Sequence, residues 1–351
     1  MQILITGAAG FLGLHLAKLH LAKYLTEKKY TLILVDIAPF AKEEYPKGCQ
    51  FHFGDVRNQK MMDMLAKKSD VVIHAAAALP LWKAEEIMDI NINGTKNMLD
   101  AAFKNKVKRF IHISSTAVYG VPKVHPIHEN AALIGVGHYG QSKIQAERLC
   151  NQYQKKGLTV TIVRPKTFVG TYRLGVFEIL FDWIKDGKRI PIIGSGNNRY
   201  QLLDVDDLTE AVYRFIKSDK KNANGTFNIG AEEFATVKRD LESLFKYAGN
   251  KSKVFSTPAF LVKKLLWLFE KLKISPLYQW VYETADKDSF VSIERLKKTL
   301  RWKPRYSNSQ ALIKSYQWYL ENYKEIKSRP VGINHTSGWK QGILGFFKRF
   351  M

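Results

Sequence analysis

The stretch HYGQSK, residues 138–143, places a tyrosine four residues before a lysine in a segment with helical character. Side chains at that spacing lie on one face of a helix, so the phenol of Tyr139 and the ammonium group of Lys143 can meet. An isolated pair of this kind is usually a surface or half-buried contact. The alternative is a proton-transfer pair, in which the cation lowers the pKa of the phenol from its reference value of about 10.

A glycine-rich turn follows the first apolar run of the chain. The run QILIT, residues 2–6, predicts a buried strand and leads into GAAGFLG, which contains Gly7, Gly10 and Gly13. A helical pattern follows, and then a second apolar run, YTLILVD, that ends at Asp36. This order is typical of a dinucleotide site, because glycines let a pyrophosphate approach the backbone and the start of the helix. A carboxylate at Asp36 would bind ribose hydroxyls and repel a 2′-phosphate, which favours NAD over NADP.

Further strand patterns alternate with helical ones along the first half of the chain. They are DVVIHAAA, RFIHISS and TVTIVRP, at residues 70–77, 109–115 and 159–165. This alternation predicts an α/β fold with a doubly wound parallel sheet, whose ligands bind beyond the carboxyl ends of the strands. Ser115 ends one of these strands, on the edge of the sheet where HYGQSK begins its helix. Ser115 would therefore hold a substrate hydroxyl, Tyr139 would exchange its proton, and Lys143 would contact the nicotinamide ribose.

Composition limits the remaining function classes. The chain has 351 residues, two cysteines and a formal net charge of +23. The cysteines, Cys49 and Cys150, lie far apart, so neither a disulfide framework nor a metal cluster is expected. The start of the chain does not read as a signal peptide, and no stretch approaches the ~20 apolar residues of a membrane span. We expect a cytoplasmic protein. The positive charge favours an anionic ligand, while nucleic acid is not expected because no zinc-finger or RNP pattern occurs.

These motifs resemble those of the NAD-dependent epimerase/dehydratase family, in the extended short-chain dehydrogenase/reductase superfamily. The matching segments are TGAAGFLG, Asp36, GDV, HAAA, NINGT, SSTAVYG, Tyr139 with Lys143, RPKTFVG, LLDVDDL and FNIG, which occur in the family's order. The resemblance implies a Rossmann fold, tightly held NAD, a Ser115–Tyr139–Lys143 triad and a smaller C-terminal substrate domain. It also implies a homodimer.

The residues and the resemblance together give a set of expected contacts. Residues expected to contact the cofactor are Gly7, Gly10, Phe11, Leu12, Gly13, Asp36, Asp55, Val56, Ala75, Ala76, Ala77, Tyr139, Lys143 and Pro165. Residues expected to contact the substrate are Ser115, Thr116, Thr167 and Arg199. Asp55 and Val56 would contact the adenine ring, and the alanines would let the cofactor lie close to the backbone.

Some positions depart from the family pattern and bear on the substrate. The family's nucleotide-sugar dehydratases carry an Asp-Glu pair directly after the catalytic Ser/Thr, whereas this chain has Thr116 and Ala117, which disfavours dehydration. Thr167 replaces an asparagine that contacts the diphosphate in sugar-nucleotide epimerases, and it follows an unusual Lys166. Arg199 is displaced by one residue from the usual arginine. The segment SGNNRYQLLDVDDL also resembles the 3β-hydroxysteroid dehydrogenase-like branch.

The pattern divides the chain into three parts. Residues 1–170 form the expected NAD-binding domain, with return segments near 200–235, and residues 171–325 are mainly the substrate domain. Within it, residues 258–282 are rich in Leu, Phe and Trp with interleaved lysines, which predicts a helix that packs on the core. The alternative for this stretch is an apolar substrate mouth or a membrane-facing surface. Residues 326–351 form a basic amphipathic tail, for which we expect peripheral membrane contact, although a dimer contact or disorder remains open.

Three functions follow from these patterns. The first is NAD-dependent epimerisation of a nucleotide-sugar through a transient keto intermediate. The second keeps the chemistry but acts on a lipid or another apolar secondary alcohol, with NAD consumed. The third is a non-catalytic NAD-binding scaffold or sensor, against which the intact triad argues.

Overall fold

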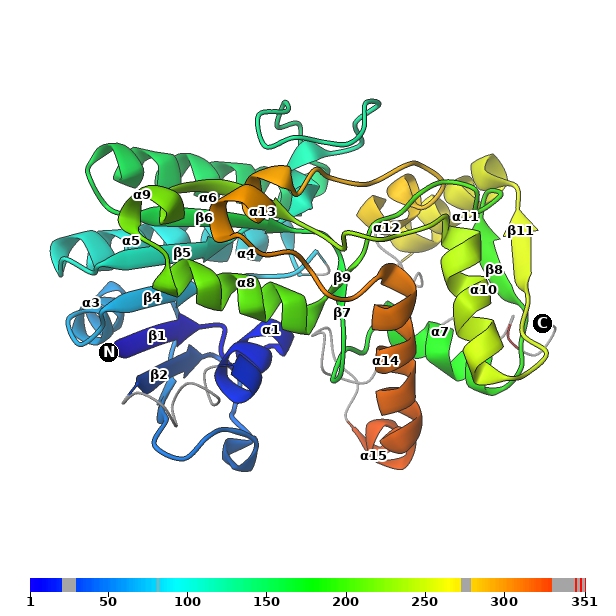
Figure 1. Ribbon diagram of the computed structural model, residues 1–351, viewed down its shortest axis with the longest axis horizontal. Coiled ribbons are helices and arrows are strands. Elements are labelled where there is room, and N and C mark those ends of the chain that lie inside the picture. The colour runs from blue at the N-terminus through cyan, green and yellow to red at the C-terminus, as the bar shows by residue number, and fades with distance from the viewer. Residues whose placement is uncertain (21–29, 81, 273–278, 330–344, 346–347, 349–350) are drawn as a thin grey trace.

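The computed structural model describes residues 1–20, 30–80, 82–272 and 279–329, together with residues 345, 348 and 351. A parallel seven-stranded sheet with helices on both faces forms one lobe, and a smaller lobe of helices and short strands stands beside it (Figure 1). The predicted doubly wound sheet is confirmed.

The seven strands lie in the order β10-β6-β5-β4-β1-β2-β3. Their bounds are β1 Gln2–Thr6, β2 Thr31–Asp36, β3 Gln50–Phe53, β4 Val71–His74, β5 Arg109–Ile113, β6 Val160–Pro165 and β10 Gly225–Ile229. Because β1 pairs with both β2 and β4, the strand order reverses beside β1. Ligands of open α/β sheets bind at such a reversal, beyond the carboxyl ends of the strands.

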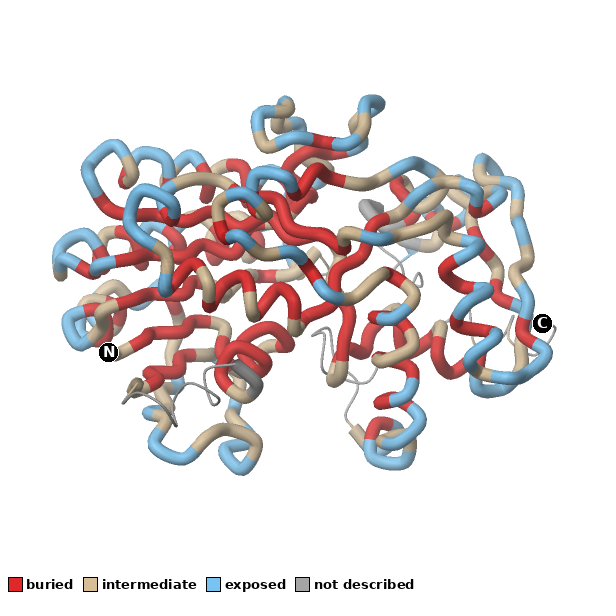
Figure 2. The backbone as a smooth tube through the Cα atoms, in the orientation of Figure 1, coloured by how far each residue is buried: buried red, intermediate tan, exposed pale blue. Residues whose placement is uncertain are grey.

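Both faces of the sheet are buried, which explains the continuous apolar strands (Figure 2). In β1, Ile3 and Ile5 belong to the core on one face and Leu4 to the core on the other. One face is covered by α1 Phe11–His15 with the π-helical η1 Leu16–His20, by α8 Val205–Lys217 and by α13 Glu294–Leu300. The other is covered by α3 Gln59–Ala66, η3 Asp89–Gly94, α5 Thr95–Lys104 and α6 Gly137–Lys155. Shorter elements around the sheet are η2 Lys42–Glu44, α4 Ala84–Met88, η4 Thr116–Tyr119 and α9 Lys220–Ala223.

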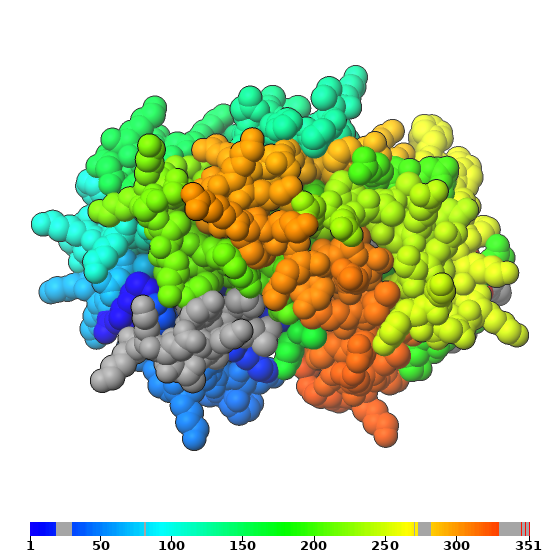
Figure 3. Space-filling model, in the orientation of Figure 1, coloured from blue at the N-terminus to red at the C-terminus, as the bar shows by residue number. Residues whose placement is uncertain are grey.

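The second lobe has its own core, which contains Phe181, Trp183, Leu244, Leu312 and Tyr319. Its elements are α7 Val176–Lys185, β8 Ile190–Ile193, α10 Val237–Ala248, β11 Val254–Thr257, α11 Ala259–Lys271, α12 Gln279–Thr284, α14 Asn308–Glu321 and α15 Tyr323–Ser328. The short strands β7 Phe168–Val169 and β9 Leu203–Asp204 pair between the lobes. Near the C-terminus, α13 packs on the sheet and α14 belongs to the second lobe. The orange surface that contains both helices therefore extends over both lobes (Figure 3).

Most of the expected C-terminal tail lies outside the described residues. Of the residues that are described, Lys348 forms ion pairs with Asp182 and Asp186 of the second lobe, and Met351 packs against the core of that lobe. The helices of the described chain include none that is long and apolar enough to cross a membrane.

Two buried histidines lie side by side on β4 and β5. His74 and His112 are register partners, and their rings stack with centroids 5.6 Å apart. The nitrogens of His74 lie 2.8 Å and 3.0 Å from the hydroxyl oxygens of Thr6 and Thr95, whereas neither ring nitrogen of His112 has a hydrogen-bond partner within the described chain. Burial lowers the pKa of His74 to about 3 and that of His112 well below its ordinary value.

We expect this pair to make the fold sensitive to acid. The unfolded chain binds protons on both imidazoles below about pH 6.5, whereas the folded chain does not, so stability falls as the pH falls. For His74 the loss between pH 7.5 and pH 5 is about 2 kcal/mol. Asp204 works in the opposite direction, because burial raises the pKa of its carboxyl group to about 6.

The contribution of His112 is isolated by comparing the wild type with His112→Phe. Urea unfolding at pH 7.5 and pH 5 should show a smaller loss of unfolding free energy in the variant. An equal loss in both proteins would show that His112 titrates normally in the fold.

Candidate active site

A cavity opens at the carboxyl ends of β1, β2 and β4, where the strand order reverses. It is lined by most of the residues predicted to hold the cofactor: Gly7, Gly10, Phe11, Leu12, Gly13, Asp36, Val56, Ala75, Ala76, Ala77, Tyr139 and Lys143. These residues come from five separate segments of the sequence, so the fold brings the predicted set together. We call this the cofactor cavity.

Two glycines of the turn after β1 have no room for a side chain. Gly7 has a φ of +69°, and a Cβ there would lie 2.6 Å from the backbone nitrogen of Ala76. A Cβ on Gly13 would lie 2.2 Å from the carbonyl oxygen of Gly7. Both glycines therefore allow α1 to start directly against β1, with its first turn at the cavity. Amide groups at the start of a helix favour phosphate oxygens, so this cradle fits the diphosphate of a dinucleotide.

Asp36 stands at the end of β2, on the side of the cofactor cavity expected for a ribose. Its two carboxylate oxygens accept hydrogen bonds from the backbone amides of Ala9 and Ala38, each at 2.9 Å. These bonds orient the carboxylate, and its burial raises the pKa. A carboxylate held in this way can accept hydrogen bonds from ribose hydroxyls and disfavours a 2′-phosphate.

The segment NINGT connects the cavity wall with α6, the helix that carries Tyr139 and Lys143. Asn91 lies in the π-helical turn η3 and is buried; its side chain accepts a hydrogen bond from the amide of Ala78 at 2.8 Å and donates to Ser142 Oγ at 2.9 Å. Ser142 in turn donates to the carbonyl oxygen of Tyr139 at 2.8 Å. This chain of bonds fixes the first turn of α6 relative to the wall of the cofactor cavity.

Tyr139 and Lys143 lie on one face of α6, as predicted from their spacing. The Nζ atom of Lys143 lies 5.9 Å from the centre of the Tyr139 ring and donates to the carbonyl oxygen of Ile113 at 3.0 Å. Lys143 is only 3% exposed, and its burial lowers the pKa of the ammonium group to about 8, an effect that Glu147 partly opposes. The amine is therefore mostly charged at neutral pH and close to the phenol.

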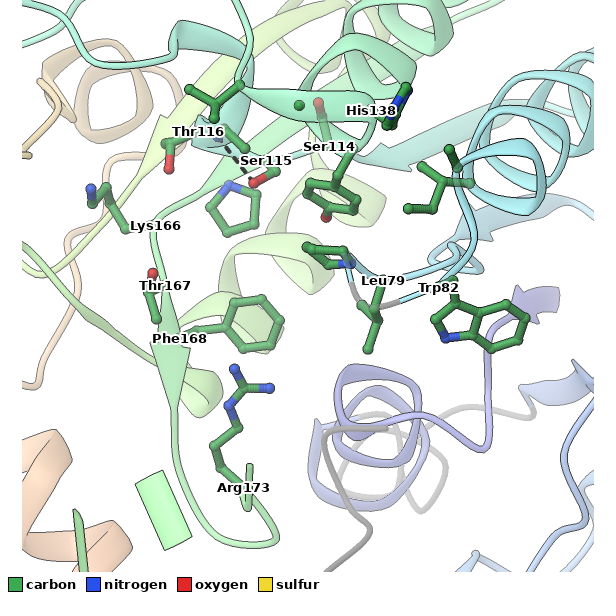
Figure 4. Close-up of a pocket in the computed structure, with 18 residues that line it drawn as sticks. Leu79, Trp82, Ser114, Ser115, Thr116, His138, Lys166, Thr167, Phe168 and Arg173 are labelled. Carbon is green, nitrogen blue, oxygen red and sulfur yellow. Dashed lines mark hydrogen bonds between the residues drawn. The ribbon is translucent and has the colours of Figure 1, made fainter. Parts of the chain in front are cut away.

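A second cavity, the substrate cleft, continues from the first. Figure 4 shows Ser115, Thr116, Lys166, Thr167 and Phe168 along one side, with Leu79 and Trp82 across from them and Arg173 below. Tyr139 lines both the substrate cleft and the cofactor cavity. Its ring therefore stands where a cofactor and a substrate would meet.

The polar groups of the substrate cleft are suited to an anion. Lys166 is 2% exposed, and its Nζ donates to Ser289 Oγ at 2.6 Å; its burial lowers the pKa of the amine to about 7. The guanidinium of Arg173 lies over the rings of Phe11 and Phe177, at 5.5 Å and 5.7 Å. Among the described residues that line the cleft, none is Asp or Glu.

Three of the predicted contact residues lie elsewhere. Asp55 is not part of the cavity lining, because its carboxylate is bound by Arg57, with Nη2 at 2.6 Å. Pro165 lines the substrate cleft rather than the cofactor cavity. Arg199 is exposed and lines neither; its guanidinium stacks on two aromatic rings, those of Phe234 and Phe290, at 4.7 Å and 4.6 Å.

The structure contains a buried ion pair next to Lys143 that the sequence motifs did not predict. Glu147 lies one turn after Lys143 and binds Arg164 through both carboxylate oxygens, at 2.9 Å and 2.5 Å. Glu147 also accepts a hydrogen bond from Ser114, and Arg164 donates to the hydroxyl of Tyr119 at 2.7 Å. Arg164 belongs to the RPKTFVG segment, but nothing in the sequence pairs it with Glu147.

Comparison with known proteins places the chain in a family. The model of the NAD dependent epimerase/dehydratase family matches residues 3–230. The chain is 32% identical over 343 residues to an uncharacterized protein of Sinorhizobium fredii, covering 97% of this chain and 84% of that one. It is 32% identical over 236 residues to the N-acetyl-alpha-D-glucosaminyl-diphospho-ditrans,octacis-undecaprenol 4-epimerase of Escherichia coli O157:H7, covering 65% of this chain and 66% of that enzyme.

Solved structures agree with this assignment. UDP-glucuronic acid 4-epimerase from Bacillus cereus, in complex with NAD, aligns with a TM-score of 0.74 at 25% identity, covering 92% of this chain and all of that one. The residues of the cofactor cavity fit the same cofactor, as the glycine cradle and Asp36 indicate. The chain belongs to the NAD dependent epimerase/dehydratase family, the extended short-chain dehydrogenase/reductase enzymes that use NAD.

Proposed function

We propose that this chain is an NAD-dependent epimerase of a nucleotide-activated sugar, which it inverts through a transient keto sugar. The observation that carries the proposal is the position of Tyr139, which lines the cofactor cavity on one side and the substrate cleft on the other. The relatives support the substrate class, because those with assigned activities include enzymes named as epimerases of diphosphate-linked sugars.

Each triad residue has a distinct role in this reaction. Bound NAD would accept a hydride from the carbinol carbon and later return it. Tyr139 takes the hydroxyl proton as the ketone forms and gives it back in the reverse step. The charge of Lys143 favours the phenolate form of Tyr139, which is the form that takes this proton. Ser115, whose Oγ accepts a hydrogen bond from the amide of Ala117 at 3.1 Å, holds the reacting oxygen.

The lining of the substrate cleft favours epimerisation over dehydration. Elimination of water needs acid and base groups beside the sugar, and in this family's dehydratases an acidic pair follows the catalytic Ser/Thr. Thr116 and Ala117 occupy those positions at the cleft, and the described lining includes no carboxylate. The keto sugar would therefore rotate in the cleft and receive the hydride on its opposite face.

A third cavity bears on the part of the substrate beyond the sugar. It adjoins the cleft at Thr167 and Arg173, which line both. Most of its other side chains are apolar, among them Phe177, Trp183 and Leu241. In the proposed reaction Lys166 and Arg173 bind the diphosphate, and the apolar cavity receives the group attached to it. The same apolar lining supports the second candidate, oxidation of a lipid or another apolar secondary alcohol.

The two candidates differ in what happens to the cofactor. The purified enzyme is incubated with UDP-, GDP-, ADP- and dTDP-sugars, and products are followed by NMR while NADH is followed by absorbance. Epimerisation gives a new sugar isomer without net NADH and with NAD retained in native mass spectra. Stoichiometric NADH from an apolar alcohol supports the second candidate. Absence of turnover with every sugar nucleotide would contradict the first.

Lys166 gives a prediction about the pH dependence of substrate binding. Its amine is mostly protonated at pH 6 and mostly neutral at pH 8, because burial lowers the pKa to about 7. An anionic substrate binds the protonated form, so KM should rise as the pH rises through 7. A charge-assisted hydrogen bond of about 1.5–3 kcal/mol corresponds to a rise of roughly 10- to 100-fold in KM at pH 6 for Lys166→Met.

Arg199→Met is the matched control, since it also removes one cation but lies outside the cleft. It should leave KM within about twofold of the wild type, a difference of less than 0.5 kcal/mol. A KM that rises equally in both variants would show that only the overall charge matters.

A further inference from the structure

Helix α11 carries an exposed apolar face that the reaction does not use. Its large apolar side chains are mostly exposed, with Phe260 at 67%, Leu261 at 62% and Trp267 at 49%. This overturns the expectation that the helix buries its apolar face in the core. The exposed side, here called the α11 face, consists of Phe260, Leu261, Lys264, Leu265, Trp267, Leu268, Lys271 and Leu272.

The α11 face has two parallel stripes. Residues 261, 265 and 268 are leucines at helical spacing, and Leu272, directly after the end of the helix, continues this aliphatic ridge. The neighbouring stripe alternates aromatic and basic side chains. Lys264 Nζ lies 4.3 Å from the centre of the Phe260 ring, and Lys271 Nζ lies 3.9 Å from that of Trp267. No acidic residue belongs to this face as defined.

The opposite side of α11 attaches the helix to the second lobe. Leu266 is buried there, and Lys263 forms an ion pair with Asp286 at 2.6 Å. The helix packs beside β8, whose residues also line the apolar cavity (Figure 1). The α11 face is therefore held outward by fixed contacts, in the same lobe as the apolar cavity.

We propose that the α11 face binds the surface of an anionic phospholipid membrane. At 13 residues, α11 is too short to span a bilayer, which takes ~20, but it can lie in the interface with its leucines and aromatic rings among the acyl chains. Lys264 and Lys271 have long aliphatic stems, so their ammonium groups reach lipid phosphates while the stems stay in apolar surroundings. The formal net charge of +23 adds long-range attraction to an anionic surface.

A second copy of the chain fits this face less well. Lysine is depleted in the cores of protein interfaces, and a two-fold contact would place the same basic stripe on both partners. The lysines stand between the aromatic rings and the leucine ridge, so they would be buried without carboxylates from this face. Lipid phosphates supply the missing negative charge.

Vesicle flotation of the full-length protein tests the proposal. Vesicles of phosphatidylcholine with 30% phosphatidylglycerol are compared with pure phosphatidylcholine, and we expect at least tenfold stronger binding to the anionic ones. Leu261→Ser with Leu268→Ser should reduce that binding at least tenfold. Lys264→Gln with Lys271→Gln should reduce the preference for anionic over neutral vesicles. Because all four side chains are exposed, the melting temperatures should stay unchanged.

The matched control replaces two exposed apolar residues elsewhere, Met64→Ser with Val124→Ser, and should bind as the wild type does. Light scattering gives the oligomeric state of every protein. The proposal fails if the wild type binds neither vesicle, if the leucine variant binds as well as the control, or if that variant instead converts a dimer to a monomer. It also fails if truncation after Arg329 abolishes binding while the leucine variant does not, since the contact would then belong to the tail.

Discussion

Tyr139→Phe is expected to lower kcat about a thousandfold while leaving bound NAD in place. The substitution removes only the phenolic oxygen of a ring that lines both the cofactor cavity and the substrate cleft, where the proposed proton exchange takes place. The ring remains to pack, and Lys143 keeps its hydrogen bond to the carbonyl oxygen of Ile113. The loss should therefore fall on the chemical step rather than on folding or on cofactor binding.

The matched control is Tyr153→Phe, on the same helix. The hydroxyl of Tyr153 bonds to Asp100, away from both cavities, so this variant also loses one phenolic oxygen but should keep kcat within about twofold, a difference of less than 0.5 kcal/mol. The measurements are kcat on the sugar nucleotide that the wild type converts and the NAD released on denaturation. A Tyr139→Phe enzyme with a tenth or more of wild-type activity would refute the assigned role.

A comparison of Tyr139→Phe with Gly10→Asp addresses the non-catalytic interpretation. A scaffold or sensor needs bound NAD but not proton transfer, so cells carrying Tyr139→Phe would behave as wild type while cells carrying Gly10→Asp would not. If the protein acts as an enzyme, cells carrying either variant lose its function. Gly10 precedes the first turn of α1 at the cofactor cavity, where a carboxylate would repel a diphosphate.

The sheet and the cofactor cavity could be predicted because their signals are local. A strand buried on both faces must be apolar throughout, as β1 is with Ile3, Leu4 and Ile5, and a turn that cannot hold a Cβ must be glycine. Once the strands are parallel, their carboxyl ends share one edge, so Asp36 and Ser115 lie at the same edge of the sheet although 79 residues separate them in the sequence. The topology of the sheet therefore brings together residues that are far apart in the sequence.

Two predicted contacts, Asp55 for the cofactor and Arg199 for the substrate, lie outside the expected cavities, because their partners follow from packing in the fold and not from a sequence motif. Asp55 binds Arg57 two residues away, and Arg199 stacks on Phe234 and Phe290, from segments that no spacing rule connects with it. The exposed face of α11 shows the same limit. Its periodic leucines predict a helix correctly, but periodicity does not say whether the apolar side meets the core or the solvent.

The buried ion pair behind the triad gives the largest expected effect on stability. Arg164 and Glu147 are 4% and 1% exposed, and together they join β6 to α6, one helical turn after Lys143. Arg164→Met leaves the carboxylate of Glu147 buried with the Ser114 hydroxyl but without its cation. Breaking a buried pair on one side costs about 3–5 kcal/mol, which urea unfolding at pH 7.5 measures as a lower midpoint with an unchanged slope.

The double variant Arg164→Met with Glu147→Leu separates the ion pair from packing. Replacing both charges with apolar groups is often close to neutral, so the double variant should recover most of the lost stability. Recovery stays incomplete, because Arg164 also donates to the hydroxyl of Tyr119 and the carbonyl oxygen of Glu129. If the losses of unfolding free energy in the two single variants, Arg164→Met and Glu147→Leu, add up to the loss in the double variant, the two residues do not interact.

The double variant should nevertheless have an altered pH profile, which connects this pair to catalysis. Burial already lowers the pKa of Lys143 to about 8, and the carboxylate of Glu147 is the larger of the two nearby influences that oppose this shift. Without it, the pKa of Lys143 falls further and the amine loses its proton at a lower pH. A neutral amine no longer favours the phenolate of Tyr139, so the pH range in which kcat depends on the charge of Lys143 should move toward acid. An unchanged profile would mean that Glu147 serves the fold alone.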